Sequence, residues 1–394
     1  MASYQFLLKQ LLLPHLKLIK AEQQSLRVIR LYCQKTTDWE VCRKCPTKSY
    51  QVHDSREVRI LDTRLKNKSV ILVIRKRRFR CPCCNAVFTE MVPGIKHRYR
   101  TTERFREQVM RRSVNYNNLS LVAKRSKISE TLVGNICYPR MELALRKSKN
   151  TPWGSTISMD EHGLKKGKYR KEFVVPFVDI GRRCVRELAH STNHVDMKQA
   201  IEHIPGKENV NFVVMDLSRN FRLFATEYFP NAKIVADKFH VLHRLSPAIR
   251  KYRKEITGDK RTNPIRWLLL KNYKDLECHQ KRAVAEFCRI HTKVGEVYAY
   301  KERLHGFYRI KGYKQARRVL GKLLDDMAHS KIKEIQTLRK TLLSWHEEIL
   351  RYFGTGLTNA RIEGFNRKCK LIQRKAYGFK SFKNYRLRVL FETM

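Results

Sequence analysis

The sequence predicts a multidomain α/β protein with two small N-terminal modules ahead of a mixed sheet. The chain has 394 residues, which is more than one ordinary domain needs. Paired cysteines between residues 42 and 84 indicate a first module, and helical spacing from residue 101 onward indicates a second. From residue 156, short apolar runs rich in β-branched residues follow one another and then alternate with helical stretches. That alternation is typical of a mixed α/β sheet.

The charge balance indicates an anionic partner. Lysine and arginine total 84 against 36 aspartates and glutamates, a formal net charge of +48. A charge of this size repels itself and favours binding to nucleic acid or to an anionic membrane face. The apolar stretch over residues 6–19 is interrupted by Lys9, Pro14 and Lys17 and is too short to span a bilayer. We therefore expect no membrane association and a cytoplasmic location, where disulfides are rare.

Two cysteine clusters predict one structural zinc site. Cys42 and Cys45 form a C-x-x-C turn, and the second cluster holds Cys81, Cys83 and Cys84. Two such turns supply the four thiolates of a tetrahedral zinc ion. Cys84 is favoured as the fourth ligand because it keeps the two-residue gap from Cys81, and Cys83 is the alternative. Buried free cysteines would not explain the paired spacing.

The segment between the cysteine clusters predicts a β-hairpin with strands over residues 56–61 and 69–75. A basic run begins at the end of the second strand, and such a run suits contact with DNA phosphates, although a solvated face is the other interpretation. The predicted phosphate contacts are Arg75, Arg77 and Arg78.

The next segment predicts a helix-turn-helix. Residues 101–113 have helical spacing, residues 119–123 follow as a second helix, and Ser129 is suited to cap a third. The exposed side of that last helix would present Thr131 and Asn135 to a DNA groove. The turn lacks the glycine that is often found there, so a plain pair of packed helices is the alternative.

Acidic residues stand at the ends of two apolar strands. Strands are predicted over residues 156–160, 172–180, 184–189, 211–216 and 233–237, with helices over 194–204 and 219–229. Asp160 ends the first of these strands and Asp216 ends the fourth. A carboxylate at the end of a buried strand is costly unless it is paired or binds a cation such as Mg²⁺. Each aspartate taken alone could instead cap a helix or a turn.

A late helix carries a third acid. Residues 354–370 predict a capped helix after a glycine turn, with Glu363, Asn366, Arg367 and Lys370 on one face. A polar face lies towards water or a ligand, and one acid among cations suits a metal beside a phosphate backbone. Asn366, Arg367 and Lys370 are therefore predicted to contact DNA. An ordinary surface ion pair between Glu363 and Arg367 would explain the same pattern.

Four sequence blocks together resemble the insertion-sequence transposases of the ISL-three type. They are SMDEHGLKKG at 158–167, VMDLS at 214–218, ADKFHV at 236–241 and LTNARIEGFN at 357–366. The zinc turns and the helix-turn-helix occur in the same order in that family, so the resemblance covers nearly the whole chain. It implies a ribonuclease-H-like core with an Asp-Asp-Glu triad on Asp160, Asp216 and Glu363. Such a triad would hold two Mg²⁺ or Mn²⁺ ions.

The resemblance and the sequence patterns together predict six segments. These are an N-terminal helical segment (1–36), a zinc-binding domain (37–98), a helix-turn-helix domain (99–150), the first part of the catalytic core (151–241), a helical insertion (242–352), and a second part of the core with the Glu363 helix (353–394). Asp237 and His240 precede the insertion, and a structural role at the strand exit is favoured over a role in shaping the site. Trp267 and Trp345 within the insertion are expected in its core rather than stacked on DNA.

The predicted activity is metal-dependent DNA cleavage at the ends of a bacterial insertion sequence, followed by strand transfer into target DNA. The zinc domain and the helix-turn-helix would bind the terminal inverted repeats, and joining two ends implies at least a dimer on DNA. Two alternatives stay open from the residues alone. A DNA-binding transcription regulator would leave the strand-end acids unexplained, and a structure-selective nuclease would use the same carboxylates without strand transfer.

Overall fold

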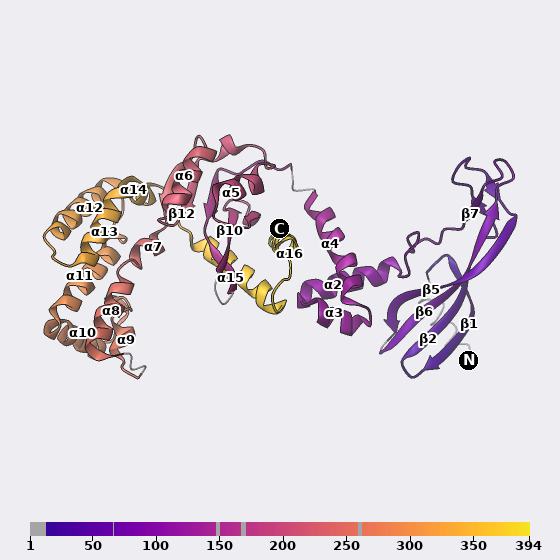
Figure 1. Ribbon diagram of the computed structural model, residues 1–394, viewed down its shortest axis with the longest axis horizontal. Coiled ribbons are helices and arrows are strands. Elements are labelled where there is room, and N and C mark those ends of the chain that lie inside the picture. The colour runs from indigo at the N-terminus through magenta and orange to yellow at the C-terminus, as the bar shows by residue number, and fades with distance from the viewer. Residues whose placement is uncertain (1–12, 66, 147–149, 167–170, 259–261) are drawn as a thin grey trace. The chain divides into compact units, whose positions relative to one another are not determined.

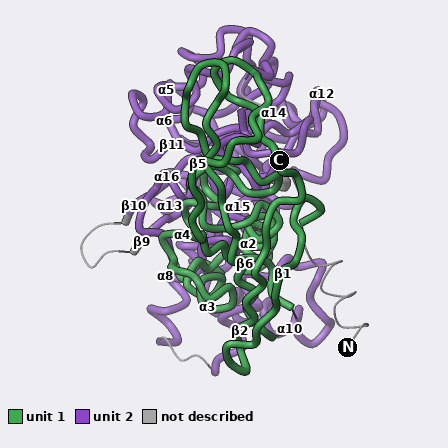
Figure 2. Tube along the Cα trace, turned by 90° about the vertical axis from the view of Figure 1, so that its right-hand side faces the viewer, with its two compact units in different colours: residues 1–140, 375–377 green, residues 141–374, 378–394 purple. Residues whose placement is uncertain are grey.

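Figure 1 shows a computed structural model that describes residues 13–65, 67–146, 150–166, 171–258 and 262–394. The chain divides into two compact units, shown in Figure 2. The first comprises residues 1–140 and 375–377, and the second comprises residues 141–374 and 378–394. Among the described residues, no helix has both the length and the apolar character that crossing a membrane requires.

A five-stranded sheet dominates the first unit. Its strands are β1 (Leu16–Ser25), β2 (Val28–Lys35), β5 (Val52–Leu65), β6 (Lys68–Arg80) and β7 (Val87–Thr89), in the order β1-β2-β6-β5 with β7 paired to β6. The predicted hairpin is confirmed as β5 and β6, which pair antiparallel and extend beyond the predicted ends. Two short strands, β3 (Glu40–Val41) and β4 (Lys48–Ser49), pair beside the cysteines.

The N-terminal strands correct the prediction of a helical segment over residues 1–36. Residues 1–12 lie outside the described residues, and β1 and β2 occupy most of the remainder. Ile29, Leu31 and Cys33 alternate with more exposed residues along β2 and are buried in the core of the sheet. A period of two residues is that of a strand, and parallel pairing with β6 buries this apolar side.

Three helices follow the sheet: α2 (Glu103–Tyr116), α3 (Leu119–Ser126) and α4 (Glu130–Arg146). Thr102 caps α2, and the Ser129 hydroxyl accepts the N–H of Leu132 at 3.2 Å, as the sequence predicted for the third helix. Lys127 takes the left-handed conformation between α3 and α4 (φ 53°). It occupies the turn in which a glycine is often found and which lacks one here. Val133 and Ile136 are fully buried on α4.

A six-stranded mixed sheet forms the centre of the second unit, which confirms the predicted α/β sheet. The strands are β8 (Thr156–Met159), β9 (His162–Lys166), β10 (Lys171–Asp179), β11 (Cys184–Ala189), β12 (Phe212–Met215) and β13 (Lys233–Ala236). Their order is β11-β10-β8-β12-β13, with β9 paired to β10. β10 runs antiparallel to both β8 and β11, whereas β12 runs parallel to both β8 and β13.

Helices cover both faces of this sheet. Val175 and Phe177 of β10 belong to a core with α5 (His194–Ile201) and α6 (Arg219–Tyr228). Val174 and Val178, the alternate residues, belong to a second core with α15 (Ala360–Lys375) and α16 (Phe382–Thr393). Because successive residues of a strand point to opposite faces, the two cores lie on opposite sides of the sheet.

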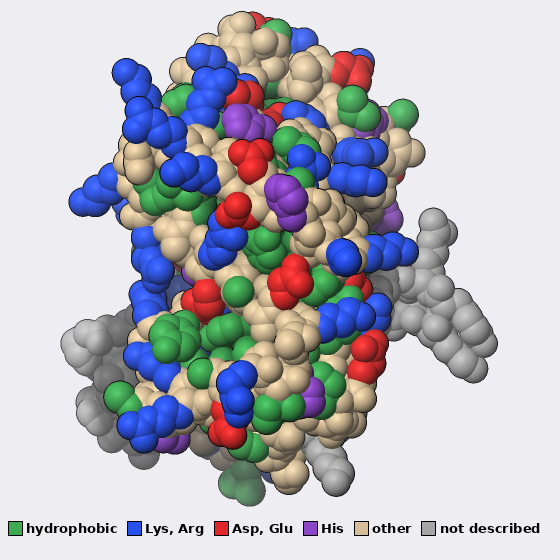
Figure 3. Space-filling view, turned by 90° about the vertical axis from the view of Figure 1, so that its left-hand side faces the viewer, with side chains coloured by type: hydrophobic (Ala, Val, Ile, Leu, Met, Phe, Trp, Pro, Cys, Tyr) green, Lys and Arg blue, Asp and Glu red, His purple; other side chains and the backbone are tan. Residues whose placement is uncertain are grey.

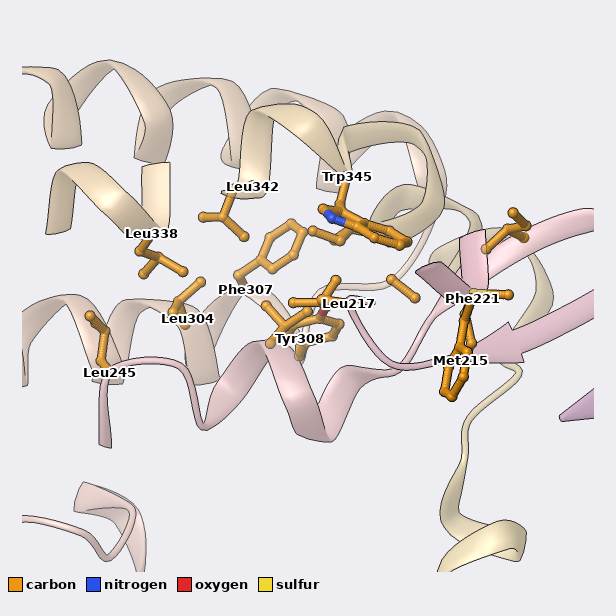
Figure 4. Close-up of a cluster of buried hydrophobic side chains, with 14 of the residues drawn as sticks. Met215, Leu217, Phe221, Leu245, Leu304, Phe307, Tyr308, Leu338, Leu342 and Trp345 are labelled. Atoms are coloured by element: carbon orange, nitrogen blue, oxygen red, sulfur yellow. The ribbon is translucent and has the colours of Figure 1, made fainter. Parts of the chain in front are cut away.

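The described residues between 242 and 352 are helical and contain no strand, as the sequence predicted. After α7 (Lys238–Leu242) come α8 (Ser246–Thr257), α9 (Ile265–Leu268), α10 (Cys278–Ile290), α11 (Thr292–Phe307), α12 (Tyr313–Ala328), α13 (Lys333–Ser344) and α14 (His346–Thr355). Figure 4 shows part of the buried cluster that joins Phe307 and Trp345 of this insertion to Phe221 of α6. Trp345 is therefore a core residue, whereas Trp267 is 55% exposed.

Candidate catalytic and zinc sites

Three aspartates stand at the exits of neighbouring strands in the second unit. Asp160 follows β8, Asp216 follows β12 and Asp237 follows β13. These strands are parallel, so their carboxyl ends share one edge of the sheet, which is where open α/β sheets bind ligands. Asp160 and Asp216 are half-buried, and Asp237 is only 3% exposed.

The three carboxyl groups repel one another electrostatically. Burial raises the pKa of Asp160, Asp216 and Asp237 above the ordinary range, and the charges of Asp216 and Asp237 raise the pKa of Asp160 further. His240 opposes this effect, with its Nε2 3.9 Å from Oδ2 of Asp237. A divalent cation bound among these carboxylates would favour their charged forms and offset the repulsion between them.

Other buried acids of the described residues have arginine partners within the fold. The pairs are Asp62 with Arg104, Glu90 with Arg77, Asp179 with Arg182, Glu187 with Arg386, and Glu348 with Arg222. In contrast, no described lysine or arginine lies within ion-pair distance of Asp160, Asp216 or Asp237. The sheet edge thus concentrates negative charge that His240 and Arg244 offset only in part, because burial still raises the pKa of Asp160, Asp216 and Asp237.

Helix α15 is bound to this edge by polar contacts near its start. The backbone N–H of Asn359, just before the helix, donates to Oδ1 of Asp237 at 3.2 Å. Its side-chain Oδ1 accepts a hydrogen bond from the Ser158 hydroxyl on β8. Two turns later, Nδ2 of Asn366 donates to Oδ2 of Asp160 at 2.7 Å. Glu363 lies between Asn359 and Asn366 on the same side of the helix, because residues four and seven apart share a face.

The Glu363 carboxylate itself pairs with Arg367 at 2.6 Å on the helix surface. Both side chains are more than half exposed, at 55% and 77%. Among the described residues, the metal-ligand atoms that lie within 4.8 Å of one another in groups of three or more are those of four cysteines. The structure therefore brings the Glu363 helix to Asp160 but does not gather the three predicted carboxylates into one cluster.

Three residues predicted to contact DNA, which are Asn366, Arg367 and Lys370, belong to the Glu363 helix. Asn366 is buried, and its amide group donates a hydrogen bond to Asp160. The structure therefore corrects the predicted role of Asn366 from contact with DNA to orientation of that aspartate. Lys370, one turn further along, is exposed. Arg367 is 77% exposed and pairs with Glu363.

The four predicted zinc ligands lie together in the first unit. Sγ of Cys42 is 3.6 Å from Sγ of Cys84, and Sγ of Cys45 is 3.3 Å from Sγ of Cys81. All four sulfur atoms lie within 4.8 Å of one another, a spacing that suits a single tetrahedral zinc ion. Cys83 is exposed and outside this group.

Local backbone contacts shape the cysteine cluster. The N–H of Cys42 donates to the carbonyl of Thr47 at 2.9 Å, and the N–H of Cys81 donates to the carbonyl of Ala86 at 2.9 Å. A hydrogen bond to the Thr47 hydroxyl is the main cause that lowers the pKa of Cys45 to about 6. Each C-x-x-C turn is therefore closed by the residues that follow it, and Cys45 favours the thiolate form that metal binding needs.

The basic run of β6 has two different sides. Arg77 is buried, and its guanidinium binds Glu90 at 2.8 Å and the carbonyl of Thr37. The structure therefore corrects the predicted DNA contact at Arg77, because this charge is already neutralised inside the fold. Arg75 is exposed, and Arg78 is 46% exposed, where its guanidinium pairs with Asp54 at the surface.

Helix α4 presents the two polar residues predicted for a DNA groove. Thr131 and Asn135 are exposed, four residues apart on one side of the helix. Val133, Ile136 and Cys137 are buried on the other side. The polar pair is therefore positioned on a surface rather than in the packing between helices.

A family model for transposases of the ISL3 type matches residues 157–389, more than half of the 394-residue chain. The chain belongs to the ISL3 family of transposases. A second model, for the zinc-finger of the transposases IS204, IS1001, IS1096 and IS1165, matches residues 39–84. The transposase for insertion sequence element IS1001 of Bordetella parapertussis is 23% identical over 377 residues, which cover 92% of this chain and 91% of that protein.

These matches confirm the resemblance stated from the sequence blocks. This ISL3 transposase is a DNA-processing enzyme with an N-terminal zinc ribbon and a C-terminal transposase domain. The sequence predicts a structural role for Asp237, although Asp237 ends an apolar strand in the same way as Asp160 and Asp216. The rule that selected those two aspartates would also have selected Asp237.

Proposed function

We propose that this transposase cuts DNA at the terminal inverted repeats of its element and joins the freed 3′ ends to target DNA. Asp160, Asp216 and Glu363 would be the catalytic acids and the ligands of two Mg²⁺ or Mn²⁺ ions. The observation that carries the proposal is the pair of strand-end aspartates without a basic partner, one of which is bonded through Asn366 to the helix of Glu363.

The sheet topology supports a ribonuclease-H-like catalytic core. Strands β8, β10 and β11 form an antiparallel set, and β12 and β13 then continue the sheet parallel to β8. Helices cover both faces, and the helical insertion separates β13 from the Glu363 helix. This arrangement agrees with the fold that membership of the family implies.

The residues of the sheet edge fit a divalent cation. Bound there, the ions would activate water or a DNA 3′-hydroxyl and stabilise the leaving 3′-oxygen. The N–H of Glu161 and the amide of Asn366 hold opposite oxygens of Asp160, and the N–H of Ser218 holds Asp216 at 3.1 Å. Each carboxylate oxygen has two lone pairs, so these bonds fix the orientation and leave acceptor capacity for a metal.

Glu363 would reach the metal by exchanging its partner. Its carboxylate pairs with Arg367 in a half-exposed position, and an ion pair of this kind contributes only about 0–1 kcal/mol. A divalent cation held by Asp160 and Asp216 would compete successfully for the carboxylate. Arg367 would then be free to bind a DNA phosphate beside the reacting bond.

The first unit would supply DNA recognition. Helices α2, α3 and α4 are consistent with a helix-turn-helix that presents Thr131 and Asn135 to base edges, while Arg75 and Arg78 contact phosphates. One Zn²⁺ held by the four cysteines would stabilise the ribbon. Lysine and arginine side chains are also spread over the face shown in Figure 3, and such charge gives sequence-independent affinity for double-stranded DNA. Joining two ends would require at least a homodimer on DNA.

The test is Asp216→Asn in a cleavage assay on DNA that carries the element ends. We expect cleavage to fall more than about a hundredfold, because loss of an outer contact alone costs 10–100-fold at a metal site. DNA affinity, measured in parallel by a mobility shift, should stay near normal. Asp326→Asn is the matched control, because this exposed acid of α12 pairs with Arg303.

Equal cleavage by Asp216→Asn and the wild type would remove Asp216 from the mechanism. Glu363→Gln tests the third member of the triad in the same assay. Strand-transfer products formed with Mg²⁺ or Mn²⁺ distinguish transposition from a nuclease, which would cut the DNA but would not join it.

A further inference from the structure

We propose that Asp237 is a positioning residue that holds the start of α15, and with it Glu363, against the metal-binding edge of the sheet. This role rests on the proposed triad and adds a residue to it. Asp237 would act through Asn359 and would not itself bind the metal.

The burial of Asp237 requires an explanation. It is one of six buried acids among the described residues, and the other five pair with arginines. An isolated buried carboxylate is costly unless hydrogen bonds compensate for the lost water. The partner observed for Asp237 is the backbone N–H of Asn359, at 3.2 Å from its Oδ1. The compensation therefore comes first from the residue that begins the Glu363 helix, and in smaller part from the backbone N–H groups of Phe239 and His240, all of which lower the pKa of Asp237.

This hydrogen bond joins the two ends of the helical insertion. Asp237 is the last residue before the chain leaves the sheet through α7, and Asn359 is the residue at which it returns. The two lie 122 residues apart in sequence. This contact holds the returning chain to the end of β13, next to the bond from Arg351 of α14 to the carbonyl of Ile234 on β13 at 2.9 Å.

The position of Glu363 depends directly on that return point. Four residues separate Asn359 from Glu363, which is about 6 Å along a helix axis. Asn359 is also held by the Ser158 hydroxyl, which lies 3.1 Å from the carbonyl of Val214 on β12. Asn366 anchors the next turn to Asp160. Glu363 therefore sits between two anchors, and Asp237 supplies the first.

The geometry disfavours Asp237 as a metal ligand. Its Oδ1 is used by Asn359, and its Oδ2 lies 3.9 Å from Nε2 of His240. At 3% exposure it is enclosed, whereas Asp160 and Asp216 are half-buried and open to a ligand. Asp160 and Asp216 also accept backbone N–H groups, so the difference lies in the burial of Asp237, which leaves little access for a metal ion or a substrate.

The test compares Asp237→Ala with Asp237→Asn in the full-length protein. Hydrogen exchange of the amides in residues 357–366 is measured without metal or DNA, with residues 382–393 of α16 as the internal control. The alanine variant should exchange at least about tenfold faster over 357–366 and unchanged over α16. The asparagine variant keeps an acceptor oxygen and should stay close to the wild type.

The second measurement is DNA cleavage and its dependence on Mg²⁺. Asp237→Ala should lower cleavage about 10–100-fold, as expected when an outer contact of a metal site is lost. Asp237→Asn should restore most of the cleavage and keep the wild-type Mg²⁺ concentration for half-maximal cleavage. If Asp237→Ala does not fold, Asn359→Pro removes the N–H donor and keeps the aspartate, and Asn359→Ala is its control, because it keeps the N–H and loses only the side-chain contact with Ser158.

Two results would overturn the proposal. Unchanged exchange over 357–366 in the alanine variant would show that Asp237 does not hold the helix. A loss of cleavage in Asp237→Asn as severe as in Asp237→Ala, with a raised Mg²⁺ requirement, would make Asp237 a ligand instead. Failure of the triad is a separate outcome, because it appears as wild-type cleavage by Glu363→Gln and leaves the exchange result unaffected.

Discussion

The cysteine cluster and the carboxylate cluster differ in how complete they are. In the cysteine cluster, four sulfur atoms already lie within 4.8 Å of one another. In the carboxylate cluster, Asp160 and Asp216 stand at the sheet edge while Glu363 pairs with Arg367. Structural zinc sites are closed by four protein ligands, whereas catalytic sites keep positions open for substrate and water.

The difference shows what each cluster contributes to the fold. The cysteines hold together short turns with few apolar residues, so the proposed zinc ion would replace a core. The carboxylates belong to a sheet whose faces are both covered by apolar side chains, so the fold does not need a metal there. Loss of the cysteine cluster should therefore unfold the surrounding segment. Loss of the carboxylates should lower DNA cleavage and leave the fold intact.

The largest effect is expected from Cys84→Ser. Structural zinc contributes about 10 kcal/mol or more to the folding of small domains, and the loss of one thiolate removes most of that stabilisation. We expect the zinc content to fall from one ion per chain towards zero and residues 39–84 to become sensitive to protease. Elemental analysis and limited proteolysis measure the two quantities.

Cys83→Ser is the matched control for this prediction. Cys83 is exposed and outside the cluster, although it neighbours Cys84. The variant should keep full zinc content and protease resistance. Loss of zinc from Cys83→Ser with retention by Cys84→Ser would assign the fourth ligand to the other cysteine.

A second prediction compares two acids of the same unit. Glu187→Gln removes the partner of Arg386 from a buried position and should lower the free energy of unfolding by about 3 kcal/mol. Asp160→Asn removes a charge that other carboxylates repel, so stability should be unchanged or higher while cleavage is lost. Chemical denaturation without added metal measures both variants. Equal destabilisation by the two changes would show that Asp160 stabilises the fold as much as Glu187 does, contrary to the proposed difference between them.

The sequence predicted the residues whose signal is local. Cys42 and Cys45 form a turn of four residues, and their role follows from spacing alone. Asp160 and Asp216 follow from the apolar strands that precede them, although the assignment of Glu363 depended on the family resemblance. Most strands and helices of the core were found in the same way, because their apolar residues recur with the period of the element.

The remaining errors come from partners that are distant in sequence. The bond between Asn366 and Asp160 spans 206 residues, so the sequence showed only a polar helix face. Arg77 belonged to a basic run, and its burial depends on Glu90 across a later turn. The strand β9 has the composition of a loop and forms through pairing with β10. Each of these features exists because of a tertiary contact that no local pattern records.

The smallest predicted effect concerns the ion pair between Arg367 and Glu363. Arg367→Gln removes the partner that holds Glu363 away from the aspartates. Since an exposed pair of this kind is worth about 0.5 kcal/mol, the Mg²⁺ concentration for half-maximal cleavage should fall about twofold. DNA affinity should weaken at the same time, because the variant loses one phosphate contact and its salt dependence becomes shallower. Arg374→Gln, an exposed change two turns along the same helix, should alter the DNA affinity without changing the Mg²⁺ requirement. A Mg²⁺ requirement that rises in Arg367→Gln would mean that Arg367 helps to deliver Glu363 to the metal rather than competing for it.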